Sequence, residues 1–198
     1  MNRLYINGSD RWLTPPDLIG LLGPFDFDPC CEPLMPWRTA TTMIALPTLA
    51  RPQDEGETGF LQPGDLPNGV RADVAGDGLA RLDLWQGLGW MNHPYGQSGL
   101  EWAEAFVEHD NGIALTASKS LDTQWGQMFL RHCRLMYLPA GRILFRYPDG
   151  SPSTGKWLPN ALWAFGDVAE ERLRTFAYGA SVGANKYKGV LMRHAPLR

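Results

Sequence analysis

The sequence has few cysteines and lacks the spacings that would give them a structural role. Only Cys30, Cys31 and Cys133 occur in 198 residues, and no Cys-x-x-Cys pair is present. Three cysteines are too few for a disulfide framework, and their spacing does not suit a structural zinc site. We therefore expect reduced thiols and no metal in a cytoplasmic protein.

Long hydrophobic runs and an excess of positive charge are also missing. No apolar run approaches the ~18 residues needed to cross a bilayer, and the first eight residues lack the apolar core of a signal peptide. We expect no membrane partner. Lys and Arg number 18 against 21 Asp and Glu, a formal charge of −3. Any contact with nucleic acid must therefore use a local basic patch.

What remains is the composition of one globular domain spanning residues 1–198. Hydrophobic residues make up 44% and charged residues 20% of the chain, which is ordinary for a folded protein. Residues 33–70 are rich in Pro, Thr, Gly and Gln and show little periodicity. We expect them to form a loop-rich insertion, since loops of such length usually serve a function or stay mobile.

Apolar strands and amphipathic helices alternate along most of the chain. Expected strands are residues 25–28, 88–91, 112–116, 133–138, 141–145 and 160–165, and expected helices are 17–22, with Thr14 as N-cap, 99–110 and 123–132. The last thirty residues are expected to combine a helix with a short basic end. This alternation predicts an α/β fold with a mostly parallel central sheet flanked by helices.

Polar residues lie at the carboxyl ends of two of these strands. Asp26 and Asp28 alternate with phenylalanines in the strand 25–28, and Asn92-His93-Pro94-Tyr95 follows the strand 88–91. Ligands of α/β folds bind outside the carboxyl ends of the strands. Asp28 is the better candidate of the two carboxylates because it stands last before Pro29.

The second segment suits chemistry on the exocyclic amine of a base. An Asn oxygen and a neighbouring main-chain carbonyl can accept the two amino protons and aim the nitrogen lone pair at an electrophile. An aromatic ring such as that of Tyr95 can stack on a base that has left the duplex. Asn and Pro are also common turn residues, so the segment alone could be a turn.

This segment resembles the Asn-Pro-Pro-Tyr motif of S-adenosylmethionine-dependent amino methyltransferases. Further segments occur in the order found in the phage-type DNA N-6-adenine methyltransferase (Dam-like) family: residues 10–16 (DRWLTPP), 25–29 (FDFDP), 77–79 (DGL) with Trp85, 92–95 (NHPY) with Trp102, 121–125 (LDTQW), 141–145 (GRILF) and 148–150 (PDG). The resemblance covers most of residues 10–166, and its strength lies in this shared order.

The resemblance implies a Rossmann-like fold, S-adenosylmethionine as cofactor, DNA as partner and methylation of adenine N6. It also implies a phage or prophage protein acting in the cytoplasm of a bacterial host. The sequence leaves open whether the protein is a monomer or a homodimer. Residue by residue, it implies cofactor contacts for Thr14, Pro15, Asp28, Pro29, Cys30 and, less closely, Asp77, and a catalytic role for Asn92, His93, Pro94 and Tyr95.

One residue departs from the family pattern, since His93 stands where the family usually has proline. The chemistry needs the carbonyl of this residue rather than its ring. Pro94 still disfavours a helical conformation at His93, so the carbonyl can keep its aim with less rigidity. We expect direct transfer, in which positioning supplies much of the acceleration and no strong general base is needed.

Other readings of the sequence stay open. The same fold could methylate cytosine N4, or the chain could be a catalytically impaired nucleic-acid-binding relative. Residues 33–69 are the candidate for target-strand contact, whereas Trp125 and the basic stretch 185–188 could either face DNA or serve packing and solvation. We expect Trp85, Trp90 and Trp102 in the core.

Overall fold

The computed structural model describes residues 13–32, 35–46, 48–49, 60–61, 72–94, 99–147, 150–153 and 158–193. In chain order the elements are α1 (Pro16–Leu22), β1 (Phe27–Asp28), β2 (Thr42–Ala45), β3 (Thr48–Leu49), β4 (Phe60–Leu61), β5 (Val74–Ala75), the 3-10 helix η1 (Gly78–Leu84), β6 (Gly89–Met91), α2 (Gly99–His109), β7 (Gly112–Ala117), the 3-10 helix η2 (Ser118–Ser120), α3 (Gln124–His132), β8 (Leu135–Pro139), β9 (Asn160–Phe165), α4 (Gly166–Ser181) and β10 (Gly189–Arg193).

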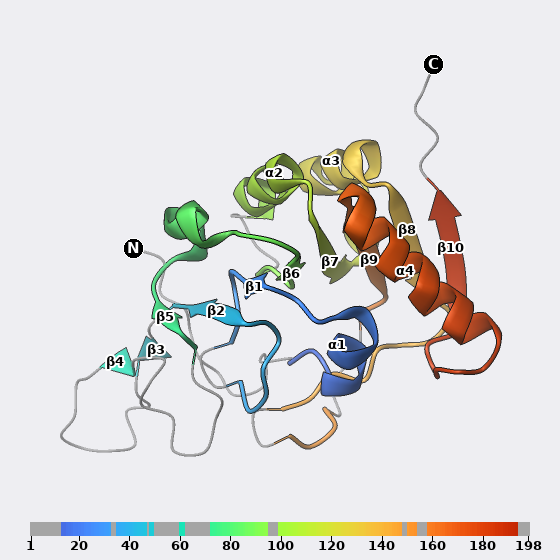
Figure 1. The fold of residues 1–198 in the computed structure, drawn as a ribbon, viewed down its shortest axis with the longest axis horizontal. Coiled ribbons are helices and arrows are strands. Elements are labelled where there is room, and N and C mark those ends of the chain that lie inside the picture. Colours follow the sequence, from blue (N-terminus) through green and yellow to red (C-terminus); the bar gives the residue numbers. More distant parts are fainter. Residues whose placement is uncertain are drawn as a thin grey trace.

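An eight-stranded mixed sheet forms the centre of this α/β fold, with the strand order β10-β8-β9-β7-β6-β1-β2-β5 (Figure 1). Neighbours from β5 to β7 pair in parallel. Strand β9 is antiparallel to both β7 and β8, and β10 is antiparallel to β8. The sheet is therefore partly parallel, and its antiparallel strands come from the C-terminal part of the chain.

The strand order reverses direction between β1 and β6. From β1 the chain moves outward to β2 and β5, and then returns to place β6 on the other side of β1. In open α/β sheets, the carboxyl ends of strands at such a switch point border the crevice where ligands bind. The topology thus brings the residues that follow β1 and β6 to one place.

Two hydrophobic cores cover the two faces of the sheet. Helices α1 and α4 pack on one face, against side chains such as Trp90 and Leu162. Helices α2 and α3 lie side by side on the other face, where they pack against Met91 and Trp163 (Figure 1). Consecutive residues of β6 and β9 thus face opposite cores, as expected for strands that are buried on both sides. Trp85, Trp90 and Trp102 are buried, as predicted.

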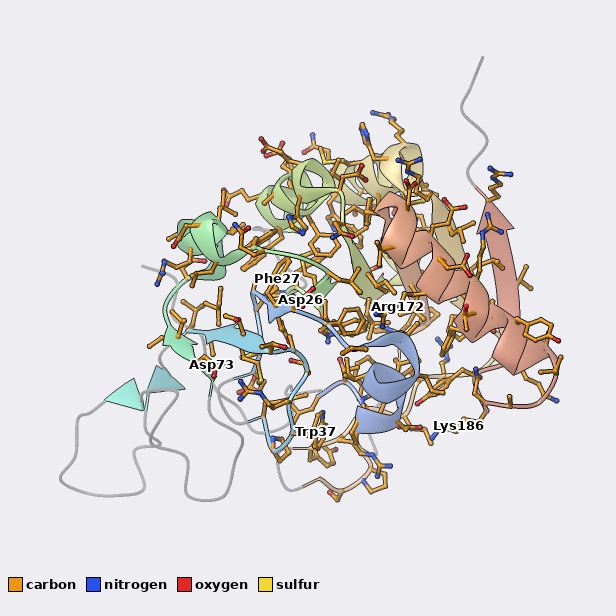
Figure 2. All side chains as sticks on the ribbon, in the orientation of Figure 1. Asp26, Phe27, Trp37, Asp73, Arg172 and Lys186 are labelled. Atoms are coloured by element: carbon orange, nitrogen blue, oxygen red, sulfur yellow. The ribbon has the colours of Figure 1, made fainter. Side chains whose placement is uncertain are left out.

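Helix α1 is held at both ends by the C-terminal part of the chain. It begins with Pro16, which suits a first helical turn. Arg172 of α4 donates hydrogen bonds to the carbonyls of Leu22 and Gly23 at its end (Figure 2). The ammonium group of Lys186 lies 2.6 Å from the Asp17 carboxylate in its first turn. These contacts fix the helix that directly follows Thr14 and Pro15.

The structure corrects several local expectations. The N-cap of α1 is Pro15, which has no capping side chain, and not Thr14. Residues 141–145 do not form a strand, although Ile143 and Phe145 are buried. Ile143 and Phe145 pack into the core without pairing to a neighbouring strand. The nearest β contacts are isolated bridges of Arg146 with Leu13 and Pro152.

In the described ranges, five strands occur where none was expected: β2, β3, β4, β5 and β10. Strand β10 is an edge strand whose residues are mostly exposed, so it lacks the apolar pattern of a central strand. Strand β2 lies within residues 33–70 and pairs with β1, so part of that segment belongs to the sheet. Residues 33–34, 47, 50–59 and 62–70 lie outside the described residues. Among the described residues, no helix is long and apolar enough to cross a membrane.

Candidate functional site

The candidate site lies where β1 and β6 end beside each other. Asp28 is the last residue of β1, and Asn92 directly follows β6. A hydrogen bond from the backbone of Asn92 reaches the Cys30 sulfur. The Asn92 side chain donates from Nδ2 to Oγ1 of Thr14, 3.4 Å away. Three segments distant in sequence are thereby joined, as the switch point of the sheet predicts.

Asp28 is a buried carboxyl group at this junction, with 3% of its surface exposed. Its two oxygens accept hydrogen bonds from the Cys30 amide at 3.2 Å and from the Thr39 hydroxyl. Burial raises the pKa of the carboxyl to about 7, although both hydrogen bonds lower it. Among the described residues, no Lys, Arg or His forms an ion pair with Asp28. A cationic ligand group would therefore be stabilised here.

Thr14 and Pro15 approach the same place from the start of α1. The Thr14 side chain is buried, and its carbonyl accepts a hydrogen bond from the indole Nε1 of Trp37 at 3.0 Å (Figure 2). Trp37 and Thr39 both belong to the Pro-rich segment in which the sequence suggested only loop. Sequence reasoning missed them because nothing in the local pattern shows that this segment folds back along β1.

Asp77 contributes to the site through its neighbour more than through its own side chain. Its exposed carboxylate caps η1 by accepting a hydrogen bond from the Leu79 amide at 3.0 Å. The next residue, Gly78, is packed against Pro29 so closely that an added Cβ would lie 1.9 Å from the Pro29 carbonyl oxygen. The Asp77-Gly78 step therefore supports the backbone that follows Asp28.

His93 turns its ring away from this junction. The imidazole is 1% exposed and lies edge-on to Trp125 of α3, with ring centroids 5.2 Å apart. Its Nδ1 lies 3.0 Å from the Pro94 carbonyl oxygen, and burial lowers its pKa. Pro94 is exposed, and Tyr95 lies outside the described residues.

Two sequence alternatives can now be judged. Trp125 is only 9% exposed and packs on His93 and Phe129, so the reading in which it faces DNA is wrong and the packing reading is right. Asp26 accepts a hydrogen bond from the Leu88 amide at 2.7 Å. Its carboxylate thus ties β1 to the start of β6 and has a structural role.

Metal ligation finds no support in the part of the chain that is described. There, no group of three or more His, Cys, Asp or Glu side chains is arranged to hold an ion. The three cysteines are free thiols, and burial raises the pKa of each. The side-chain groups at the junction are the Asp28 carboxyl, the Asn92 amide, the Thr14 and Thr39 hydroxyls and the Cys30 thiol.

No protein-family model matches the chain, and a search of curated proteins finds no match to it.

Proposed function

We propose that the chain is an S-adenosylmethionine-dependent DNA methyltransferase with a Rossmann-like fold that methylates N6 of adenine. The observation that carries the proposal is the junction of Asp28 and Asn92 at the switch point, tied by Thr14 and Cys30. A cofactor-binding carboxylate and an amine-positioning amide are the two groups that such a transfer requires, and they follow adjacent parallel strands.

The residues present fit the cofactor. Asp28 is a buried carboxyl with no ionic partner among the described residues, and S-adenosylmethionine carries an ammonium group that would compensate its charge. Thr14, Pro15, Pro29 and Cys30 border the same junction and would hold the rest of the molecule. When bound, the cofactor supplies an electrophilic methyl group on a sulfonium.

The chain's own residues would position the acceptor. The hydrogen bond from Nδ2 of Asn92 to Thr14 orients the amide, so that its oxygen would accept a hydrogen bond from the target amine. The main-chain carbonyl of His93 would accept a hydrogen bond from the second amino hydrogen. With both protons held, the nitrogen lone pair points at the methyl carbon, and positioning supplies much of the acceleration. The cofactor's sulfur would keep the electron pair of the broken S–C bond. The amine, which becomes acidic only as the N–C bond forms, would lose its proton to water, so no strong base is needed.

Product analysis tests this proposal directly. The purified protein is incubated with S-adenosylmethionine and unmethylated DNA, and the DNA is digested to nucleosides that are identified by mass. N6-methyladenine is the expected product. N4-methylcytosine would move the target to the other exocyclic amine, and no methylated base in a protein that binds the cofactor would contradict the enzymatic assignment.

The variant Asn92→Ala distinguishes catalysis from binding. It removes the amide while leaving Asp28 and Thr39 in place, so turnover should be lost and the Kd for S-adenosylmethionine should change by less than about threefold. Methylation at the wild-type rate by this variant would show that Asn92 does not position the amine.

A further inference from the structure

Asn92 and His93 are consecutive residues whose side chains lie on opposite sides of the sheet. The Asn92 amide contacts Thr14, next to α1. The His93 ring lies against Trp125 and Phe129 of α3, which covers the other face. This continues the alternation of Trp90 and Met91 in β6. The imidazole therefore faces the core beneath α3, whereas the Asn92 amide faces Thr14.

The ring is nevertheless held on several sides. It meets Trp125 at an interplanar angle of 84°, an edge-to-face arrangement that aromatic pairs favour. A Cβ added to Gly99, the first residue of α2, would lie 3.6 Å from Cε1 of His93 and 3.1 Å from Cδ1 of Trp125. With Nδ1 donating to the Pro94 carbonyl, the imidazole joins the segment after β6 to both helices of this face.

This packing can replace a covalent restraint. A proline ring fixes its own backbone φ, and proline occupies this position in the motif that residues 92–95 resemble. Histidine leaves φ free, so its backbone keeps one conformation only if the side chain is held elsewhere. The buried contact with Trp125 supplies such a hold, because moving the His93 backbone would pull the ring out of a closely packed site.

We propose, resting on the proposed function, that His93 is a positioning residue whose imidazole anchors residues 92–94 to helix α3 through Trp125. The anchor aims the Asn92 amide and the His93 carbonyl at the target amine. Trp125, whose ring is buried against His93 and Phe129, thereby contributes to the rate of transfer and not to cofactor affinity.

A double-mutant cycle tests the anchor. Trp125→Leu should lower kcat about tenfold, through loss of a pairwise contact, while the Kd for S-adenosylmethionine stays within about threefold. His93→Pro restores the restraint on φ, so adding Trp125→Leu to it should lower kcat by less than about threefold. Equal losses from Trp125→Leu in both backgrounds would overturn the proposal. Trp125→Phe, which keeps an aromatic edge contact, should retain most of the activity.

Amide hydrogen exchange gives a readout that does not depend on methylation. Trp125→Leu should raise the exchange rates of the Asn92 and His93 amides about tenfold. Gly99→Ala, which presses a methyl group on Trp125, should raise them as well. Phe176→Leu is the matched control, because it shortens a buried aromatic side chain on the opposite face; it should leave these two amides unchanged.

The two proposals fail separately. Unchanged exchange at Asn92 and His93 in both Trp125→Leu and Gly99→Ala would overturn the anchor even in an active methyltransferase. Faster exchange in a chain that methylates no base would support the anchor and contradict the proposed function.

Discussion

The hydroxyl of Thr39, in the segment between β1 and β2, donates a hydrogen bond to the buried carboxyl of Asp28 at the end of β1. Thr39 thus stabilises the ionised form of a group whose pKa burial raises to about 7. Asp28 stands at the switch point of the sheet, so under the proposed function the charge of this carboxyl group would set the affinity for the ammonium group of S-adenosylmethionine.

Replacing Thr39 should therefore change the pH dependence of cofactor binding. Thr39→Val removes the hydrogen bond and should raise the pKa of Asp28 further, so S-adenosylmethionine binding should require a higher pH. Titration calorimetry from about one pH unit below the pKa of about 7 to about two units above it measures the shift. Thr41→Val is the matched control, since the Thr41 hydroxyl bonds the Phe25 carbonyl and not a carboxylate.

Cofactor affinity in the unmodified chain should fall as the pH drops below about 7, the pKa of Asp28. A protonated carboxyl has no charge to attract the ammonium group, so protons compete with the cofactor. The Kd should rise by up to about tenfold for each pH unit below the pKa. Asp28→Asn should bind weakly and with no such dependence. A wild-type Kd that stays constant from pH 5 to 8, a range of about three units, would show that Asp28 does not bind the cation.

The same group should affect the stability of the ligand-free protein. Its pKa is about 7 in the folded chain against the model-compound value of 3.8, so the folded state binds more protons between these values. The free energy of unfolding should then decrease as pH rises from about 4 to about 7 and stay level above that.

Asp28→Asn should abolish this slope and stabilise the ligand-free chain above pH 7, by up to about 4 kcal/mol at ~1.4 kcal/mol per pKa unit. Urea denaturation at pH 5 and pH 8 measures the difference. A variant less stable than the wild type at pH 8 would mean that the carboxylate has a compensating partner in the folded chain.

Gly78 offers a test of the support behind Pro29. Gly78→Ala would place a Cβ 1.9 Å from the Pro29 carbonyl oxygen and 3.0 Å from the Trp102 ring, so the backbone after Asp28 must move. We expect a loss of about 1–3 kcal/mol in unfolding free energy and weaker S-adenosylmethionine binding. Gly76→Ala is the control, because a Cβ at Gly76 meets nothing within 4 Å. Equal effects of the two variants would show that the contact with Pro29 has no special role.

The sequence indicated the buried centre of the fold well. Residues 88–91, 112–116 and 160–165 are continuous apolar runs, and each corresponds to a strand of the sheet. Such runs are local signals, because a strand covered on both faces must be apolar throughout. Asp28 and Asn92 could be chosen in the same way, as the polar residues that follow two of the predicted strands.

The sequence indicated the edge strands and the pairing of strands less well. Exposed β10 carries no core pattern, β2 lies in a segment that resembles a loop, and residues 141–145 alternate without a ladder partner. The antiparallel direction of β9 could not be read either, because a buried strand has the same composition in both directions.

The sequence by itself determined which segments are buried, which polar residues end them and the order of the motifs, because these depend on local patterns of side chains. Only the tertiary structure decided that Thr39 meets Asp28, that Thr14 meets Asn92 and that His93 packs on Trp125. These contacts follow from strand order and from which face of the sheet each side chain occupies, and both are set by packing between segments distant in the chain.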